Sequence, residues 1–421
     1  MFFTIFRSRF QRGSAARDVA ILTLGTVIAQ IVTMAATPLL SRLYSPSEFG
    51  LLAVFLAVVS VGATLVTLRY ESSILVPKEN TESASLVLLS LFLGGGLSLT
   101  LAVLGALTPV EVLKTIGLGA LGDWVPIAFL TAAATAVFVV MQSWMNRQKK
   151  YMQMAGLRVG QSIGLAGLAI ALDLLDIENG LLIAQVCASV CLCFAAIWLG
   201  RSAALLWQTS HVKAVAVVHK NAPRYMLPAA LLDVVSLQMP VVLIAAWFGA
   251  GEAGQFSMAW RLLMLPMALV GGAIGQVFMQ RFSNLVTSPM LAGDLIKRSW
   301  LILLLIGFLP FLSMFLFGDI VFYIFLGDEW SGSGEVAKVL APMAFAMFVS
   351  SPTSGAFIIL GIQKYSLLFG AASLIYRPVS LFLGYYFGDV YLGLMVWVVF
   401  EILQIFLYQV VAWVHIKRVQ S

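Results

Sequence analysis

Twelve apolar stretches, each long enough to cross a bilayer, take up most of this chain. Of its 421 residues, 61% are hydrophobic and only 10% are charged. A helix needs about 20 apolar residues to cover ~30 Å of hydrocarbon, and the bilayer core offers no water to an unpaired backbone. The stretches are therefore predicted to be helices, because the strands of a membrane β-barrel would alternate over about 10 residues. The predicted spans are 19–43, 49–76, 84–107, 124–145, 154–172, 180–200, 226–249, 253–281, 299–318, 336–360, 364–387 and 391–416.

The basic residues between the spans predict an orientation. With the N-terminus in the cytoplasm, twenty Lys and Arg residues fall on the cytoplasmic side, and only Arg42, Lys114 and Lys338 fall on the other. This excess is typical of cytoplasmic loops, so both termini are predicted to be cytoplasmic. The net charge of +6 is then explained by lipid head groups, and no nucleic-acid partner is expected.

Two short motifs indicate that the chain repeats itself. Tyr44–Gly50 (YSPSEFG) joins spans one and two, and Phe248–Gly254 (FGAGEAG) joins spans seven and eight, 204 residues later. Similarly, Lys149–Tyr151 (KKY) and Gln363–Tyr365 (QKY) follow spans four and ten. Each half has an even number of spans, so both halves cross the membrane in the same sense. We expect an all-α integral membrane protein whose two six-helix lobes are related by a pseudo-two-fold axis along the membrane normal.

The repeat also predicts the domain limits. We expect an N-terminal lobe over 1–200, a cytoplasmic linker over 201–225 and a C-terminal lobe over 226–421. Prolines lie inside several spans of the second lobe, where each removes a helix hydrogen bond and favours a kink. These are Pro228, Pro240, Pro266, Pro342, Pro352 and Pro378.

Four ionisable residues lie well inside the spans: Asp233, Arg261, Arg377 and Glu401. A charge at mid-bilayer costs ~2.5–3.5 kcal/mol or more, so each is expected to face a partner or a wet cavity. Arg377 and Glu401 both lie about 15 Å from the outer surface at 1.5 Å per residue. Either they form an ion pair between spans eleven and twelve, or they line the cavity.

Arg261 lies about 12 Å from the outer surface, and its neighbouring span has no acid at that depth. A guanidinium binds phosphate oxygens as a planar fork, so Arg261 is a candidate to contact an anionic ligand. The alternative is an ion pair with another helix. Asp233 lies near the depth of Arg69 and Glu71, which suggests a cytoplasmic gate. Asp233 and Glu401 are also candidates to couple transport to a proton or sodium ion.

Uncharged polar residues mark spans one, seven and eight, at Gln30, Gln238 and Gln276. An amide in lipid is unfavourable unless it is hydrogen-bonded. A sugar-filled cavity would satisfy these side chains, and so would a neighbouring helix. Both interpretations stay open from the sequence alone.

The sequence offers little that is typical of an enzyme. Gly117–Gly122 spells a dinucleotide-binding motif, but it lies in a loop without the required strand and helix, and no phosphate-binding P-loop is present. Cys187, Cys191 and Cys193 lie within span six without a His or acid nearby. We therefore expect no catalytic residue, metal site or cofactor.

Four segments carry a family resemblance: Pro38–Gly50, Arg69–Pro77, Leu227–Pro240 and Gly327–Trp330. They resemble polysaccharide transporters of the multidrug/oligosaccharidyl-lipid/polysaccharide exporter superfamily, in the branch of the Wzx-like oligosaccharide flippases. The likeness runs through nearly the whole chain.

The resemblance implies a central cationic cavity lined by spans one, two, seven and eight, on which Arg69 and Arg261 would lie. It implies alternating access, with a polyprenyl-pyrophosphate-linked oligosaccharide (an O-antigen, capsule or exopolysaccharide repeat unit) passing from the inner to the outer leaflet of a bacterial inner membrane. Ion coupling, contact with membrane lipid, and partnership with a glycan polymerase and glycosyltransferases are further expectations from the resemblance.

Two alternatives are kept. A cation-coupled multidrug exporter of the same superfamily would favour acids in the outer half of the cavity, where Arg261 and Arg377 are predicted to lie. An integral-membrane glycan polymerase, ligase or glycosyltransferase would be expected to carry a large outer loop with catalytic residues, and every predicted outer loop is short.

Overall fold

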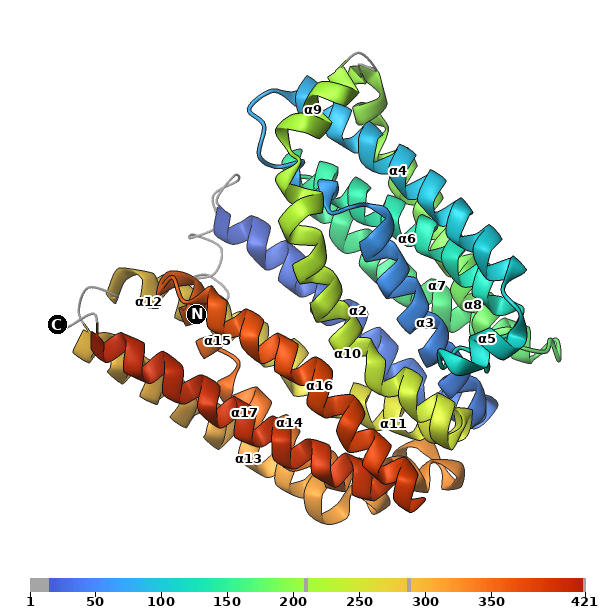
Figure 1. The fold of residues 1–421 in the computed structure, drawn as a ribbon, viewed down its shortest axis with the longest axis vertical. Helices are drawn as coiled ribbons and strands as arrows, with labels where there is room; N and C mark the ends of the chain where they lie inside the picture. Colours follow the sequence, from blue (N-terminus) through green and yellow to red (C-terminus); the bar gives the residue numbers. More distant parts are fainter. Residues whose placement is uncertain (1–14, 208–210, 286–288, 419–421) are drawn as a thin grey trace, which may run out of the picture. The chain divides into compact units, whose positions relative to one another are not determined.

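The computed structural model describes residues 15–207, 211–285 and 289–418. Over these residues the regular structure is helical, without a strand (Figure 1). Eleven helices are long and apolar enough to cross a membrane. They begin and end as α2 (Ala15–Leu43), α3 (Pro46–Val66), α4 (Asn80–Leu107), α6 (Trp124–Arg147), α7 (Tyr151–Asp173), α8 (Gly180–Gly200), α10 (Leu227–Phe248), α13 (Pro289–Leu326), α14 (Ser331–Ser350), α16 (Gln363–Phe387) and α17 (Val390–Arg418).

The remaining predicted span, 253–281, is present in three pieces. It consists of α11 (Ala250–Leu263), a π-helical turn η5 (Met267–Gly271) and α12 (Gly272–Leu285). Pro266 lies at the break and has no N–H with which to continue the α-helical hydrogen bonds, and the π-helical turn follows it directly. The all-α fold with twelve spans is thus confirmed, with the eighth span interrupted.

The chain divides into two compact units. The first comprises residues 1–44 and 55–234, and the second comprises 45–54 and 235–421. Helices α3 and α10 each contribute to both units, because the division falls within them. The predicted linker contains the short elements η2 (Arg201–Leu206), α9 (Val212–Val218) and η4 (Ala222–Met226). The domain limits proposed from the repeat stay predictions.

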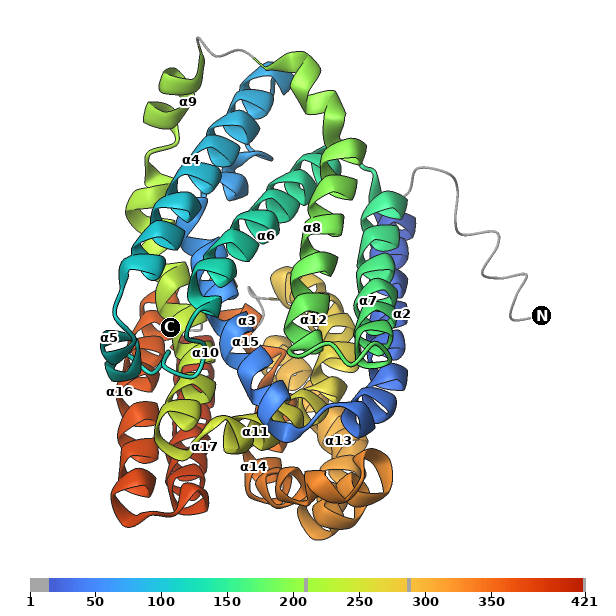
Figure 2. The same cartoon turned by 90° about the vertical axis from the view of Figure 1, so that its right-hand side faces the viewer.

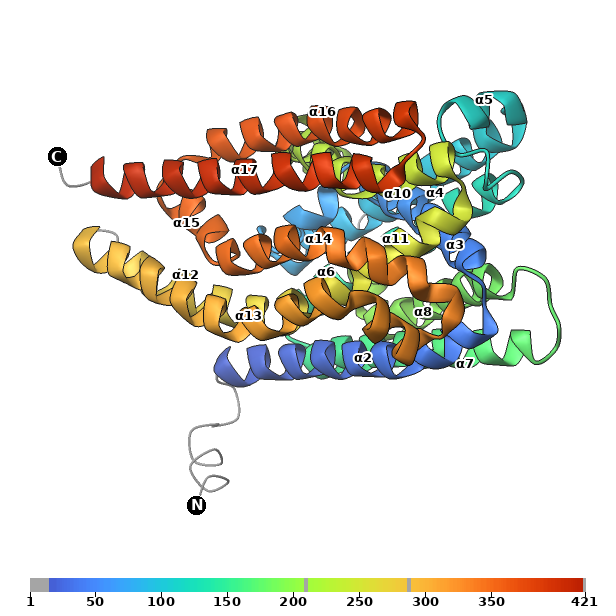
Figure 3. The same cartoon turned by 90° about the horizontal axis from the view of Figure 1, so that it is seen from below.

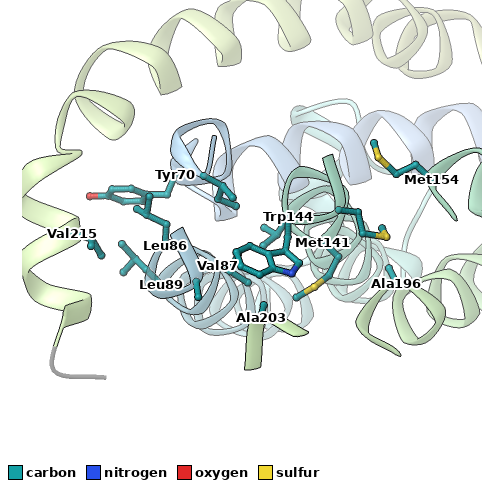
Figure 4. Packing of buried hydrophobic residues seen from close by; sticks show 14 of the residues in the cluster. Tyr70, Leu86, Val87, Leu89, Met141, Trp144, Met154, Ala196, Ala203 and Val215 are labelled. Carbon is teal, nitrogen blue, oxygen red and sulfur yellow. The ribbon is translucent and has the colours of Figure 1, made fainter. Parts of the chain in front are cut away.

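The first unit packs around α4, α6 and α8, which lie side by side in Figure 2. Trp144 of α6 is fully buried, between Val87 of α4 and Met141 (Figure 4). Its indole donates a hydrogen bond to Ser202 Oγ at 3.1 Å, so the large side chain is both packed and satisfied. Leu86 and Leu89 extend the same core toward α9.

Two basic residues of the first unit, Arg147 and Lys150, donate hydrogen bonds to backbone carbonyls where helices and loops meet. Arg147 Nη1 donates to the Pro77 carbonyl at 2.7 Å, and its Nη2 donates to the Lys78 carbonyl at 3.0 Å. Lys150 Nζ donates to the Leu199 carbonyl at 3.2 Å. Arg147 therefore stabilises the loop before α4, and Lys150 stabilises the last turn of α8.

The second unit has a core where α12, α13 and α17 meet α15 (Thr353–Ile359). Phe278 and Phe282 of α12 stack at 5.2 Å between ring centroids, and they pack with Ile296 of α13 and Ile416 of α17. Helices α16 and α17 run antiparallel along one another (Figure 3). This hairpin places side chains from its two helices at equal depth.

The start of α3 packs against α11 through two glycines. A methyl group on Gly50 would overlap the carbonyl oxygen of Ala250, and one on Gly254 would overlap the carbonyl oxygen of Pro46. The two contacts are reciprocal, since 204 residues separate both Gly50 from Gly254 and Pro46 from Ala250. The motif of the predicted repeat is thus brought against its own copy.

Candidate functional site

A buried ion pair joins three helices of the second unit. Arg377 of α16 and Glu401 of α17 form a bidentate pair, with Nη2 2.8 Å from Oε1 and Nε 3.1 Å from Oε2. The third nitrogen, Nη1, donates to the carbonyl and the Oγ of Ser236 on α10, at 2.8 and 2.9 Å. The ion pair that equal depth predicted is present.

The Glu401 carboxylate has further donors. The Tyr376 hydroxyl and the Trp397 indole each donate to its Oε2 at 2.8 Å. The Glu401 side chain is only 6% exposed and that of Arg377 only 12%. Two charges out of water are tolerable only when their hydrogen bonds are satisfied in this way. The cluster fastens α10, α16 and α17 together, and direct contact of Arg377 with substrate, or of Glu401 with a coupling ion, stays a prediction.

Arg261 has a different environment. It is half-buried near the end of α11, and no hydrogen bond or ion pair joins it to any residue that the structure describes. Its neighbour Trp260 stacks on Trp397 at 6.0 Å between centroids. The aromatic contact anchors this turn of α11 and leaves the Arg261 guanidinium available to an anion.

In the first unit, Arg69 pairs with Glu71 across a strained turn. Arg69 has a left-handed backbone (φ 62°), and so does Leu68 before it (φ 48°). Arg69 Nη1 lies 3.2 Å from Glu71 Oε1, yet Arg69 Nε and Glu71 Oε2 are buried without a hydrogen-bond partner in the described structure. Two consecutive non-glycine residues in this region are unusual and are often found at functional sites.

The remaining predicted residues are placed as follows. Asp233 is exposed on α10 and forms no ion pair with Arg69, whose acidic partner is Glu71. Gln30 on α2 and Gln238 on α10 are half-buried, and Gln238 has a polar partner. Gln276 belongs to α12, but its side chain lies outside the described residues. The roles assigned to these residues, including the gate, stay predictions.

A pocket that the sequence did not reveal lies between α12 and α13. It has a volume of about 880 Å³, and its polar lining is Arg281, Asn284, Asp294, Arg298 and Ser299. The two arginines exceed the single acid by one charge, which suits a phosphate or pyrophosphate. In the sequence, Arg281 and Arg298 lie at the two ends of one predicted loop. They contributed only to the predicted cytoplasmic charge and were not assigned to a site.

No group of three or more His, Cys, Asp or Glu side chains that suits a metal ion occurs in the described ranges. Cys187, Cys191 and Cys193 are free thiols on α8.

Comparison with known proteins gives a family and a fold. Residues 39–335 match the family described as polysaccharide biosynthesis protein. No curated protein matches the chain.

Three solved structures illustrate the fold. The lipid II flippase MurJ in an inward closed conformation is similar with a TM-score of 0.73 at 12% identity, over 93% of this chain and 87% of MurJ. An inward-facing multidrug resistance MATE family transporter gives 0.69 at 14% identity, over 96% and 98%. An outward-facing MATE transporter gives 0.58 at 17% identity, over 97% and 98%. At these identities the likeness shows the fold alone.

Proposed function

The chain belongs to the polysaccharide biosynthesis protein family, and we propose that it is a flippase for a polyprenyl-pyrophosphate-linked oligosaccharide. The cargo would be an O-antigen, capsule or exopolysaccharide repeat unit that moves from the inner to the outer leaflet. The protein would span a bacterial inner membrane with both termini in the cytoplasm. Glycosyltransferases would supply the cargo, and a glycan polymerase would consume it.

The observation that carries the proposal is Arg261. A cation inside a membrane helix is unfavourable without a partner, and among the described residues this one has none. A pyrophosphate that passes through the protein would be its counter-ion for part of the cycle. Sugar hydroxyls and pyrophosphate each cost several kcal/mol to bury unbonded, so a passage with such cations lowers the barrier that lipid alone presents.

The pocket between α12 and α13 supports the same function. Arg281 and Arg298 lie at the end of the unit that the charge distribution predicts to face the cytoplasm, where the cargo would enter. Arg281 and Arg261 belong to the two parts of one interrupted span, on either side of η5. We infer that the cargo's pyrophosphate passes from the Arg281 end to Arg261, and that the break at Pro266 allows α11 and α12 to move separately.

Ion coupling then falls to Asp233. The Glu401 carboxylate accepts hydrogen bonds from Arg377, Tyr376 and Trp397, so binding a coupling ion there would break up to four of them. Asp233 is exposed on α10 and makes no ion pair within the described structure. We propose that Asp233 binds the coupling proton or sodium ion, and that Arg69 with Glu71 forms part of the cytoplasmic gate.

The test is the leaflet position of the lipid-linked oligosaccharide. Deleting the gene in its host should make this lipid accumulate facing the cytoplasm, as measured by glycosidase access in inverted vesicles and in spheroplasts. The purified protein in liposomes should restore movement of the same lipid. If the lipid reaches the outer leaflet normally in the deletion strain and the protein instead lowers sensitivity to cationic drugs, the multidrug-exporter alternative is correct.

The enzyme alternatives predict a different lipid. A missing polymerase or ligase leaves single repeat units that have already reached the outer leaflet, and a missing glycosyltransferase leaves truncated units. Mass analysis of the accumulated lipid separates these outcomes from a complete repeat unit held in the inner leaflet.

A further inference from the structure

A second groove of the second unit lies between α13, α14 and α17. Its volume is about 640 Å³. The walls are almost entirely apolar, with Leu304 of α13, Phe345 and Val349 of α14, and Ile402 and Phe406 of α17. Phe406 is 63% exposed and Leu304 is 42% exposed, so the groove is open at the surface of the unit.

The few polar groups of this groove are gathered at one end. Lys297, Trp300, Gln409 and Trp413 lie toward the end that the charge distribution predicts to face the cytoplasm. Lys297 Nζ lies 5.2 Å from the Trp413 ring centroid, and the rings of Trp300 and Trp413 are 6.4 Å apart. A lysine with tryptophans is the usual composition of a helix end at a membrane interface.

Helix rise gives the depth of each group. From Lys297 to Leu304 the groove descends about 10 Å, and from Trp413 to Ile402 about 16 Å, at 1.5 Å per residue. The order from the interface inward is thus a cation, then the Trp300 indole and the Gln409 amide, then apolar walls.

Three polar atoms at the middle level lack partners. Trp300 Nε1, Gln409 Nε2 and Gln409 Oε1 are each buried without a hydrogen bond to the described residues. Buried polar groups of proteins are nearly always hydrogen-bonded, so a small rotation of the Trp300 and Gln409 side chains toward the groove would let them bond to a molecule bound there. Lys297 likewise has no acidic partner in the described part of the chain.

We propose that this groove binds an anionic diacyl phospholipid of the cytoplasmic leaflet. Its phosphate lies at Lys297, its ester carbonyls accept hydrogen bonds from Trp300 Nε1 and Gln409 Nε2, and one acyl chain follows the apolar walls. Phosphatidylglycerol is such a lipid, and its single negative charge is on the phosphate that would lie at Lys297. Basic pockets between membrane helices are known to select anionic lipid head groups.

The unpaired polar atoms of Trp300 and Gln409 favour a phospholipid over a polyprenyl phosphate. A polyprenyl chain follows its phosphate directly, without ester carbonyls, and would leave the Trp300 and Gln409 groups unsatisfied. A second copy of the protein that contributed only apolar side chains would do the same. The assignment does not depend on the cargo proposed above, because the cargo has a polyprenyl chain and this site requires esters.

The test is lipid-dependent stability of the full chain, purified and delipidated in detergent. Phosphatidylglycerol should raise the unfolding midpoint saturably, and phosphatidylcholine with the same acyl chains should need about tenfold more lipid. Lys297→Gln and Gln409→Leu should each weaken the phosphatidylglycerol effect at least fivefold. Lys364→Gln is the matched control, because Lys364 Nζ lies 5.3 Å from the Tyr365 ring but outside the groove, and it should change nothing.

Other results would overturn the assignment. Tighter binding of polyprenyl phosphate, weakened by the same variants, would assign the groove to a polyprenyl tail. A lipid-free dimer in native mass spectrometry that Phe406→Ser dissociates would assign it to a second copy. If Gln409→Leu does not fold, phosphatidylglycerol with a photoreactive acyl chain should label peptides of α13, α14 or α17 in the unaltered protein, and labelling confined to other helices would refute the site.

Discussion

Arg377 and Arg261 are both arginines inside membrane helices of the second unit, but only Arg377 has hydrogen-bond partners among the described residues. Arg377 is bonded by a bidentate carboxylate and by Ser236, within a cluster that also includes Tyr376 and Trp397. Arg261 has no polar partner among the residues that the structure describes. A satisfied charge stabilises one arrangement of helices, whereas an unsatisfied one is available to a passing anion.

The backbone around each arginine explains the difference. Arg377 lies in the α16–α17 hairpin, in which an antiparallel neighbour presents Glu401 at the same level. Arg261 comes two residues before α11 ends, ahead of the turn and the π-helical segment at Pro266. The continuous α16–α17 hairpin therefore contains the paired charge, and the interrupted eighth span contains the unpaired one.

The largest expected effect comes from unpairing Arg377. Glu401→Gln leaves a buried guanidinium without its counter-ion, and breaking a buried pair typically costs about 3–5 kcal/mol of folding free energy. The thermal unfolding midpoint in detergent should fall accordingly. The double variant Arg377→Met with Glu401→Leu should recover most of this loss, because apolar replacement of a whole pair is often neutral. An unchanged midpoint for Glu401→Gln would show that the pair does not hold these helices.

Ser236→Ala tests the third partner of Arg377. It removes one charged hydrogen bond and the Ser236–Ser373 contact of 2.8 Å, while the Ser236 carbonyl continues to accept from Nη1. The expected loss is about 1.5 kcal/mol, the low end for bonds to a charged group. The same unfolding measurement should place this variant between Glu401→Gln and the unaltered protein. A loss as large as that of Glu401→Gln would mean that α10 contributes as much as α17.

Arg261→Ala should separate transport from stability. Loss of one phosphate contact is expected to slow transfer of the lipid-linked oligosaccharide about tenfold, or ~1.4 kcal/mol. The unfolding midpoint should barely move, because no described contact is lost. Arg201→Ala is the control, since the exposed Arg201 only covers the Trp198 ring at 5.5 Å, and it should leave transport intact. Strong destabilisation by Arg261→Ala would reveal a structural partner and end the contrast with Arg377.

The smallest effect is expected at Arg69. The Arg69 side chain is 34% exposed and that of Glu71 is 5% exposed, so water screens the pair from the Arg69 side and its contribution is expected to be about 1 kcal/mol. Arg69→Gln should therefore shift the unfolding midpoint less than Ser236→Ala does. A larger shift would place this pair with the buried cluster of Arg377.

Much of this arrangement follows from the sequence. Hydropathy predicts the helices because the bilayer leaves the backbone no other choice, and counting depth along two adjacent spans predicts that Arg377 and Glu401 can meet. The pocket of Arg281 and Arg298 was not foreseen, because it depends on how α12 and α13 pack beyond the expected end of one span. Likewise, Pro266 predicts an interruption of the eighth span, but how many residues leave the α-helical conformation depends on tertiary packing.

The reciprocal glycines have an evolutionary consequence. If the two halves descend from one duplicated gene, Pro46–Gly50 and Ala250–Gly254 were once the same segment, and their contact was the self-complementary interface of a homodimer on its two-fold axis. In such an ancestor, a single codon change would have altered both sides of the contact at once. After fusion each copy mutates alone, and a side chain at either glycine is enough to place a carbon atom against the carbonyl oxygen of the other segment.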